Sequence, residues 1–129
     1  MSDEQLQVEL VAADRTVWSG QATMVIARTV EGDVGVLRNH APLLSLLTDA
    51  VVEITAEDGE TVIAAVDGGF LSVANNRVSI LSEHAVLAAE IDASAAQTEL
   101  EEARSSDDND AEARIRRAEA RIRAAERAS

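Results

Sequence analysis

The sequence predicts a β-rich domain, either a β-sandwich or a barrel, followed by an antiparallel α-helical hairpin. Up to about residue 88, hydrophobic residues recur with a period near two, and residues typical of tight turns divide the region into short segments. From Asp92 onward the period becomes helical, and neither glycine nor proline occurs there. With 129 residues, the chain has room for one domain and an appendage.

The first region is expected to form short strands rich in β-branched residues. Alternation begins with Leu6, Val8 and Leu10, and a short segment at Val17–Trp18 follows a turn at Asp14–Arg15. Further strands are expected at 22–30, 50–57, 60–67, 69–75 and 77–82. Turn residues at Asp58–Gly59, Gly68–Gly69 and Asn75–Asn76 separate them. The first and third of these pairs suit two-residue hairpins, which need a positive φ.

The second region is expected to form two helices joined by the loop 105–110. Residues 92–104 are good helix formers with a thin apolar stripe (Ala93, Ala96, Leu100 and Ala103). The second helix is expected to run from Ala111 to about Ala128, with Asn109 and Glu112 as a capping box. Its seam is expected to consist of Ile115, Ala118, Ile122 and Ala125. Because this seam holds so little apolar area, we expect the hairpin to move, or to pack fully only against a partner.

Composition and charge exclude several classes of function. The net charge is −13 and every basic residue is an arginine, which disfavours nucleic acid and unaided binding to an anionic membrane. The absence of cysteine excludes disulfides and thiol chemistry, and no apolar run is long enough to span a membrane. Met1–Glu4 are unlike a signal peptide, so we expect a soluble cytoplasmic protein. No nucleotide-binding, metal-ligand or nucleophile motif is found, and we predict that the chain is not an enzyme and needs no cofactor or metal.

The second helix concentrates the basic residues of this acidic chain: residues 111–129 contain six arginines and three glutamates. Arg116 and Arg123 each follow a glutamate by four residues, whereas Arg117 and Arg121 have no acidic residue three or four positions away. One interpretation is a solvated face, or pairing with Glu99 and Glu102 of the first helix. The other is an arginine stripe, which includes Arg114, that meets carboxylates on another protein.

The stretch 31–44, EGDVGVLRNHAPLL, collects two glycines, a histidine and the only proline of the chain. It is expected to form a strand and a wide turn, with Pro42 ending the hydrogen bonding at a sheet edge. Its pattern E-G-x-x-G-x-L-x-x-H-A-P-L-L resembles the epsilon subunit of bacterial F-type ATP synthases, which is called delta in mitochondria. Residues 67–85, DGGFLSVANNRVSILSEHA, resemble a second motif of this family. The order of the parts also agrees along the whole chain.

The resemblance implies a sandwich of about ten strands over residues 1–88, bound to the gamma subunit and to the ring of c subunits. Residues 89–129 would be a regulatory helix-loop-helix that inhibits ATP hydrolysis when extended. The chain would be a non-catalytic rotor subunit, peripheral to the cytoplasmic side of the bacterial membrane. The implied c-ring contact is Glu31, Asp33, Arg38, Asn39 and His40. The implied contact with the catalytic beta subunit is Arg114, Arg116, Arg117, Arg121 and Arg123.

One departure from the family concerns nucleotide binding. Some members bind ATP through an I-D-x-x-R-A motif, of which Ile91, Asp92 and Ala96 match, whereas Ala95 stands at the arginine position. Asp92 is then expected to be a helix N-cap, and ATP binding is not expected. Two other classes remain open: a free-standing β-sandwich that captures another protein with its helical arm, and an enzyme of unknown type.

Overall fold

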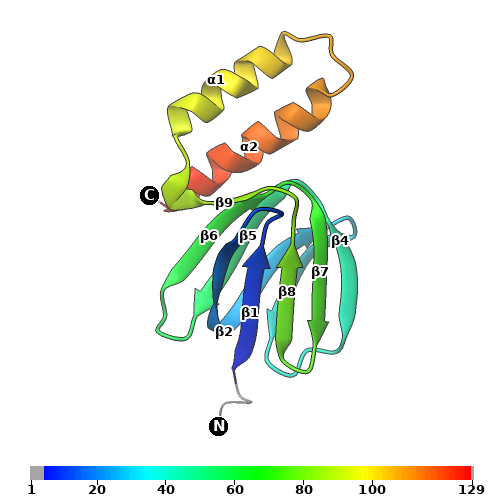
Figure 1. Cartoon of the computed structure of the whole chain (residues 1–129), viewed down its shortest axis with the longest axis vertical. Helices are drawn as coiled ribbons and strands as arrows, with labels where there is room; N and C mark the ends of the chain where they lie inside the picture. Colours follow the sequence, from blue (N-terminus) through cyan, green and yellow to red (C-terminus); the bar gives the residue numbers. More distant parts are fainter. Residues whose placement is uncertain (1–4, 129) are drawn as a thin grey trace.

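The computed structural model describes residues 5–128, so Met1–Glu4 and Ser129 lie outside the described part. The strands of this part are β1 (Leu6–Val11), β2 (Thr16–Thr29), β3 (Gly32–Leu37), β4 (Leu43–Leu47), β5 (Ala50–Ala56), β6 (Thr61–Val66), β7 (Gly69–Ala74), β8 (Arg77–Leu81) and β9 (Ala85–Leu87). A 3₁₀ turn, η2 (Ala88–Glu90), leads to helices α1 (Ala93–Arg104) and α2 (Ala111–Ala128). The predicted β-sandwich with a C-terminal helical hairpin is confirmed (Figure 1).

Strand β2 joins the two layers of the sandwich. The segments predicted around Val17–Trp18 and at 22–30 form this single strand of 14 residues. Its first half pairs antiparallel with β1, and its second half pairs with β3 and β5. The register against β5 shifts between Ala22 and Met24, an irregularity that lets a strand bend from one layer into the other. The order β1-β8-β7-β4-β2 returns to β1, because β1 pairs with both β8 and β2.

The core between the layers is aliphatic, as the scarcity of aromatic residues requires. The largest fully buried side chains are Leu6, Leu10, Ile54, Leu71, Ile80, Val8, Val25, Val36, Val52, Val66, Val73 and Val78. Trp18 is half-buried and packs against this core. Alternation along the strands places these residues inward, as predicted for Leu6, Val8 and Leu10.

Two of the predicted hairpin turns differ in length. Asn75 and Asn76 both have positive φ (51° and 59°) between the paired residues Ala74 and Arg77, which confirms a two-residue turn. The loop at Asp58–Gly59 is longer than predicted, because the N–H of Ala56 donates to the carbonyl of Glu60. Gly59 alone has a positive φ there (89°), which is typical of a three-residue hairpin loop that ends in a glycine bulge.

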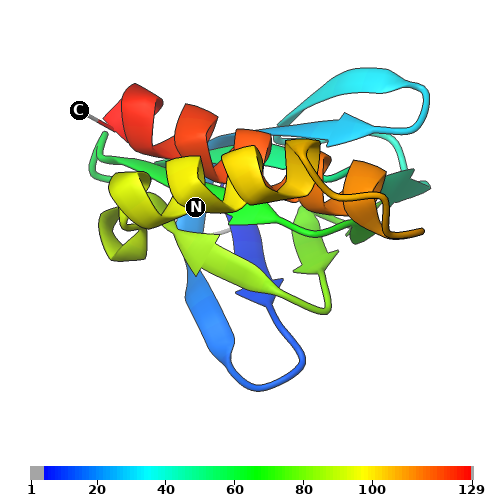
Figure 2. The same cartoon turned by 90° about the horizontal axis from the view of Figure 1, so that it is seen from above.

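Helix α2 lies between the sandwich and α1 (Figure 1), and seen from above the two helices run side by side over one end of the sandwich (Figure 2). Ala120 and Ala124 are fully buried against Ile63 and Ala65 of β6. The hairpin therefore packs on its own sandwich and needs no partner for this contact, whereas the alternative expectation, that the hairpin moves, stays a prediction. Within residues 5–128, neither helix is both long enough and apolar enough to cross a membrane.

The seam of α2 differs from the prediction because the helix contacts two neighbours at once. The buried residues of α2 are Ala118, Ala120 and Ala124, whereas Ile115 and Ile122 are only half-buried. In α1, the predicted stripe residues Ala96, Leu100 and Ala103 are buried and Ala93 is exposed. The residue before α2 is Asp110, not Asn109, and its carbonyl accepts from the N–H of Arg114.

Candidate functional site

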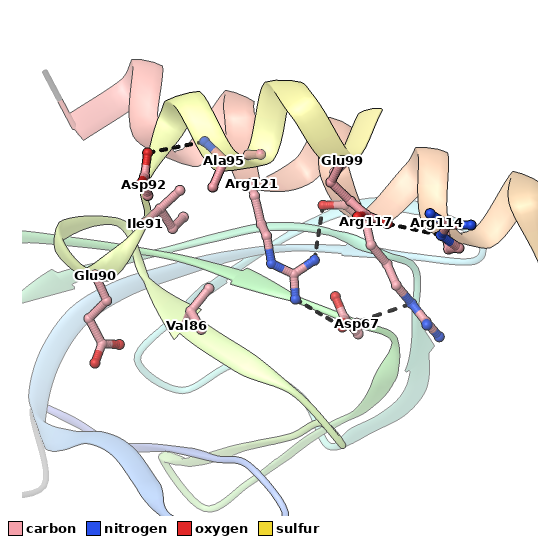
Figure 3. Close-up of a pocket in the computed structure, with 12 residues that line it drawn as sticks. Asp67, Val86, Glu90, Ile91, Asp92, Ala95, Glu99, Arg114, Arg117 and Arg121 are labelled. Carbon is pink, nitrogen blue, oxygen red and sulfur yellow. Dashed lines mark hydrogen bonds and ion pairs between the residues drawn. The ribbon is translucent and has the colours of Figure 1, made fainter. Parts of the chain in front are cut away.

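A layer of ion pairs joins α2 to the sandwich. Oδ2 of Asp67, the residue after β6, lies 3.1 Å from Nη2 of Arg121 and 3.8 Å from Nε of Arg117. Oδ2 of Asp49, in the turn between β4 and β5, lies 3.3 Å from Nε of Arg116 and 3.9 Å from Nε of Arg117. Arg117 therefore bridges two carboxylates of the sandwich, and Figure 3 shows its contact with one of them, Asp67.

Both carboxylates are largely removed from water. The side chains of Asp67 and Asp49 are 4% and 11% exposed, whereas those of Arg117 and Arg121 are 44% and 28% exposed. The N–H of Asp67 donates to the carbonyl of His84 and to the hydroxyl of Ser82, which fixes this residue at the top of β6. Desolvating a carboxylate is costly unless a cation compensates for it, and here the compensating cations come from α2.

The other arginines of α2 divide between the two neighbours. Nε of Arg114 lies 2.9 Å from Oε1 of Glu99 on α1, as one of the two interpretations of the sequence proposed. Nη1 of Arg127 lies 3.0 Å from Oε2 of Glu53 on β5. Arg123 is exposed. Thus Arg114, Arg116, Arg117 and Arg121 all have acidic partners within this chain, and three of these arginines, Arg116, Arg117 and Arg121, pair with the sandwich.

A pocket of about 460 Å³ lies between the hairpin and the sandwich, beside the ion pairs. Ile91, Asp92, Ala95 and the arginines 114, 117 and 121 all line it (Figure 3). Oδ1 of Asp92 accepts from the N–H of Ala95, 3.1 Å away, so Asp92 is the N-cap of α1 as predicted. At the position of the family's motif arginine, Ala95 contributes only a methyl group to the pocket.

An ion pair fixes the connection between sandwich and hairpin. Arg15, in the turn between β1 and β2, donates to both carboxylate oxygens of Glu90 in η2, at 2.9 and 2.6 Å. Oε1 of Glu90 also accepts from the N–H of Leu87. The hydrogen bond from Arg15, followed by the one from Leu87, lowers the pKa of Glu90 from 4.5 to about 2. Glu90 is therefore an anchor for η2 at neutral pH.

The residues of the predicted c-ring contact lie along one edge of the sheet. Glu31 is in the turn between β2 and β3, Asp33 is on β3, and the turn that follows β3 contains Arg38, Asn39 and His40. β3 pairs only with β2 among the described strands, so its other edge is open. With a rise of about 3.3 Å per residue, Glu31 and Arg38 are separated by roughly 20 Å along this edge. The structure thus places the five residues on one edge but not in one cluster.

An apolar row crosses the outer face of the sheet. Leu46 of β4 pairs with Phe70 of β7, and Phe70 pairs with Leu81 of β8. Their exposed fractions are 51%, 48% and 45%, and Leu44, two residues before Leu46, is also exposed. Several adjacent exposed apolar side chains on a soluble surface are typical of a protein interface.

The sequence predicted neither the two carboxylates nor the apolar row. Asp49 and Asp67 lie far from the arginines along the chain, and in an acidic sequence nothing distinguishes them from other aspartates. A pattern in the sequence could have indicated the row: in residues 43–47 (LLSLL), leucines occur at positions that face each of the two sides of the strand. Such a run indicates a strand that is covered on both faces.

Comparison with known proteins gives the family. The model of the ATP synthase delta/epsilon chain beta-sandwich domain matches residues 5–88. The ATP synthase epsilon chain of Streptomyces avermitilis is 57% identical over 110 residues, which cover 85% of this chain and 89% of the relative. This chain belongs to the ATP synthase delta/epsilon chain family. Its function is accordingly that of the epsilon chain, a non-catalytic subunit of the ATP synthase.

Further similar proteins agree with this assignment. The epsilon chain of Rhodococcus jostii is 52% identical over 108 residues, 83% of this chain and 87% of the relative. A chain of the Euglena gracilis mitochondrial ATP synthase superposes with a TM-score of 0.75 at 28% identity, covering 97% of this chain and 81% of that chain. A chain of the Tetrahymena thermophila enzyme shares the fold, with a TM-score of 0.62 at 16% identity and 95% of both chains covered.

Proposed function

We propose that this chain fastens the gamma subunit to the c-ring on the cytoplasmic side of the bacterial membrane and performs no chemistry itself. In this proposal the sandwich, residues 1–88, is the binding unit and the hairpin, residues 89–129, is the regulatory unit. The observation that carries the proposal is the match of the sandwich to the delta/epsilon family, together with two separate exposed surfaces on it. One surface is the open edge of β3 and the other is the apolar row Leu46–Phe70–Leu81.

The apolar row is the surface proposed for gamma, and the β3 edge is the one proposed for the c-ring. The row offers apolar area on a face of the sheet. The edge offers polar and charged side chains from Glu31 to His40, which suit the polar loops of a membrane ring.

Two matched substitutions test this assignment. Phe70→Asp and Leu37→Asp each place a carboxylate at an exposed apolar site, the first in the row and the second on β3. Phe70→Asp should abolish capture of gamma in a native pull-down, and Leu37→Asp should leave that capture intact but weaken retention on c-ring-containing membranes. The opposite pattern, or no loss in either variant, would refute the assignment. Recovery of no synthase subunit by the unmodified chain would favour the free-standing binding protein.

The hairpin is proposed to act as a brake on ATP hydrolysis once α2 leaves the sandwich. Four of the five arginines proposed to contact the beta subunit have acidic partners within the chain when α2 is docked, and Arg123 is exposed. Undocking would release these four arginines from their partners and make them available to beta. Truncation after Glu90 should keep gamma binding and raise ATP hydrolysis by the membrane-bound complex. Hydrolysis equal to that of the intact complex would mean that the hairpin is no brake.

ATP is not proposed as a ligand. Ile91 and Asp92 do line the pocket, but Asp92 caps α1, Ala95 contributes no cation, and Arg121 is paired with Asp67. Calorimetric titration of the full chain with ATP should therefore show no binding at millimolar nucleotide. Saturable heat would overturn this interpretation of Ala95.

A further inference from the structure

We propose that Asp67, supported by Asp49, is an internal counter-anion that latches α2 onto the sandwich without any bound ligand. The inference deepens the proposed brake, since it names what holds the brake off. It is tested on the isolated full chain, so that its failure and the failure of the brake can be told apart.

The geometry makes Asp67 the centre of the latch. Its carboxylate is almost wholly buried, and the cations within 4 Å of it, Arg117 and Arg121, both come from α2. Arg117 also approaches Asp49, so one helical turn of α2 holds two carboxylates of the sandwich. The apolar part of the same contact is small, because α2 contributes chiefly Ala120 and Ala124 to it. We therefore expect a change in these ion pairs to alter docking measurably.

Two polar atoms of the latch lack a hydrogen-bond partner within the described residues, and this favours a contact that can open. Oδ1 of Asp67 and Nε of Arg117 are buried without a hydrogen-bond partner in the described structure. On undocking, Asp67 and the arginines would regain water. Docking thus depends on a small difference between the cost of desolvation and the attraction between the charges.

The two sides of the latch are predicted to respond unequally. When an arginine is removed, Asp67 remains buried without full compensation as long as α2 is docked. When Asp67 is neutralised, the arginines remain partly exposed and water still reaches them. Arg121→Gln should therefore undock α2 more strongly than Asp67→Asn.

A single engineered thiol can report docking, because the chain has no cysteine of its own. Ala124→Cys places the thiol at a fully buried site between α2 and β6, so its alkylation rate in the full chain measures how often the helix leaves. Asp67→Asn should raise this rate about tenfold, and Arg121→Gln should raise it further. The double variant should fall short of the product of the two single effects, because the partners share one interaction.

Glu53→Gln is the matched control. It also neutralises a carboxylate of the sandwich that pairs with α2, through Arg127, but this pair is exposed. It should change the rate by less than about twofold. Equal rates in Asp67→Asn and Glu53→Gln, or multiplicative effects in the double variant, would overturn the latch.

Two further reporters guard against artefacts. Val52→Cys places a thiol in the core of the sandwich. Its alkylation should be equally slow in every variant, because only global unfolding would expose it. If the thiol at Ala124 itself loosens the helix, Ala65→Cys reports the same contact from the β6 side. The latch requires the same order of variants with either interface reporter, and a reversed order would refute it.

Discussion

Gly69 is the residue whose identity the backbone restricts most. Its φ is +112°, a region that side-chain-bearing residues rarely adopt, and a β-carbon there would overlap the carbonyl oxygen of Leu81 on the neighbouring strand β8. Gly69→Ala should destabilise the sandwich by about 3 kcal/mol, measured by urea denaturation. Gly35→Ala is the control, because Gly35 has no positive φ and open space around it. Gly35→Ala should lower the free energy of unfolding by no more than about 0.5 kcal/mol. Equal losses at the two sites would mean that the backbone does not restrict Gly69.

Glu90 provides a second prediction at this scale, through its titration. Its pKa is lowered to about 2 in the folded chain, so the stability that the pair with Arg15 contributes is complete above pH 4.5 and is lost as the pH falls from 4.5 towards 2. Arg15→Gln should move the carboxyl titration of Glu90 upward towards 4.5, as followed by NMR of its side chain. An unchanged midpoint would show that Arg15 does not hold this carboxylate.

The positions of the strands and helices could be predicted from the sequence, whereas most contacts between these elements could not. The alternation of Leu6, Val8 and Leu10 fixes which face of β1 is buried, and the run of helix formers fixes α1 within a residue of its ends. The docking of α2 could not be predicted, because its partners, Asp49 and Asp67, are set by the sandwich topology rather than by spacing along the chain. The same holds for the apolar row, which exists only once β4, β7 and β8 are neighbours.

Helix α2 can approach the sheet closely because its contact residues are alanines. Ala124→Leu adds three carbon atoms at a site with no free space, so it should push α2 away from β6. The expected result is faster tryptic cleavage at the arginines of α2, measured by mass spectrometry under native conditions. Ala93→Leu adds the same volume at an exposed position of α1 and should leave the cleavage rate unchanged. If both variants were cleaved equally fast, tight packing at Ala124 would not matter.

At the scale of the whole molecule, α2 is a basic layer between two acidic ones. The chain carries a net charge of −13, whereas residues 111–129 hold six arginines and three glutamates. On one side α2 faces Asp49, Asp67 and Glu53 of the sandwich, and on the other it faces Glu99 of α1. The arrangement of the layers is therefore electrostatic as well as apolar.

This layering predicts a dependence on ionic strength. The Debye length falls from about 30 Å at 0.01 M to about 3 Å at 1 M salt, so added NaCl should weaken docking and speed alkylation of a thiol at position 124. The effect should be smaller in Asp67→Asn, which has already lost part of the attraction. A rate that stays constant or falls with salt would mean that the charges do not hold the layers together.

Strand β2 has a mechanical consequence for a subunit of the ATP synthase. It is one unbroken stretch of backbone from the turn beside Arg15 to the turn at Glu31, and it belongs to both layers. A sideways force on the β2–β3 turn is therefore transmitted to the opposite layer through the covalent backbone of β2. It does not depend only on noncovalent packing between the two layers. We therefore expect the two layers to resist sliding past one another under shear, because the single strand β2 belongs to both.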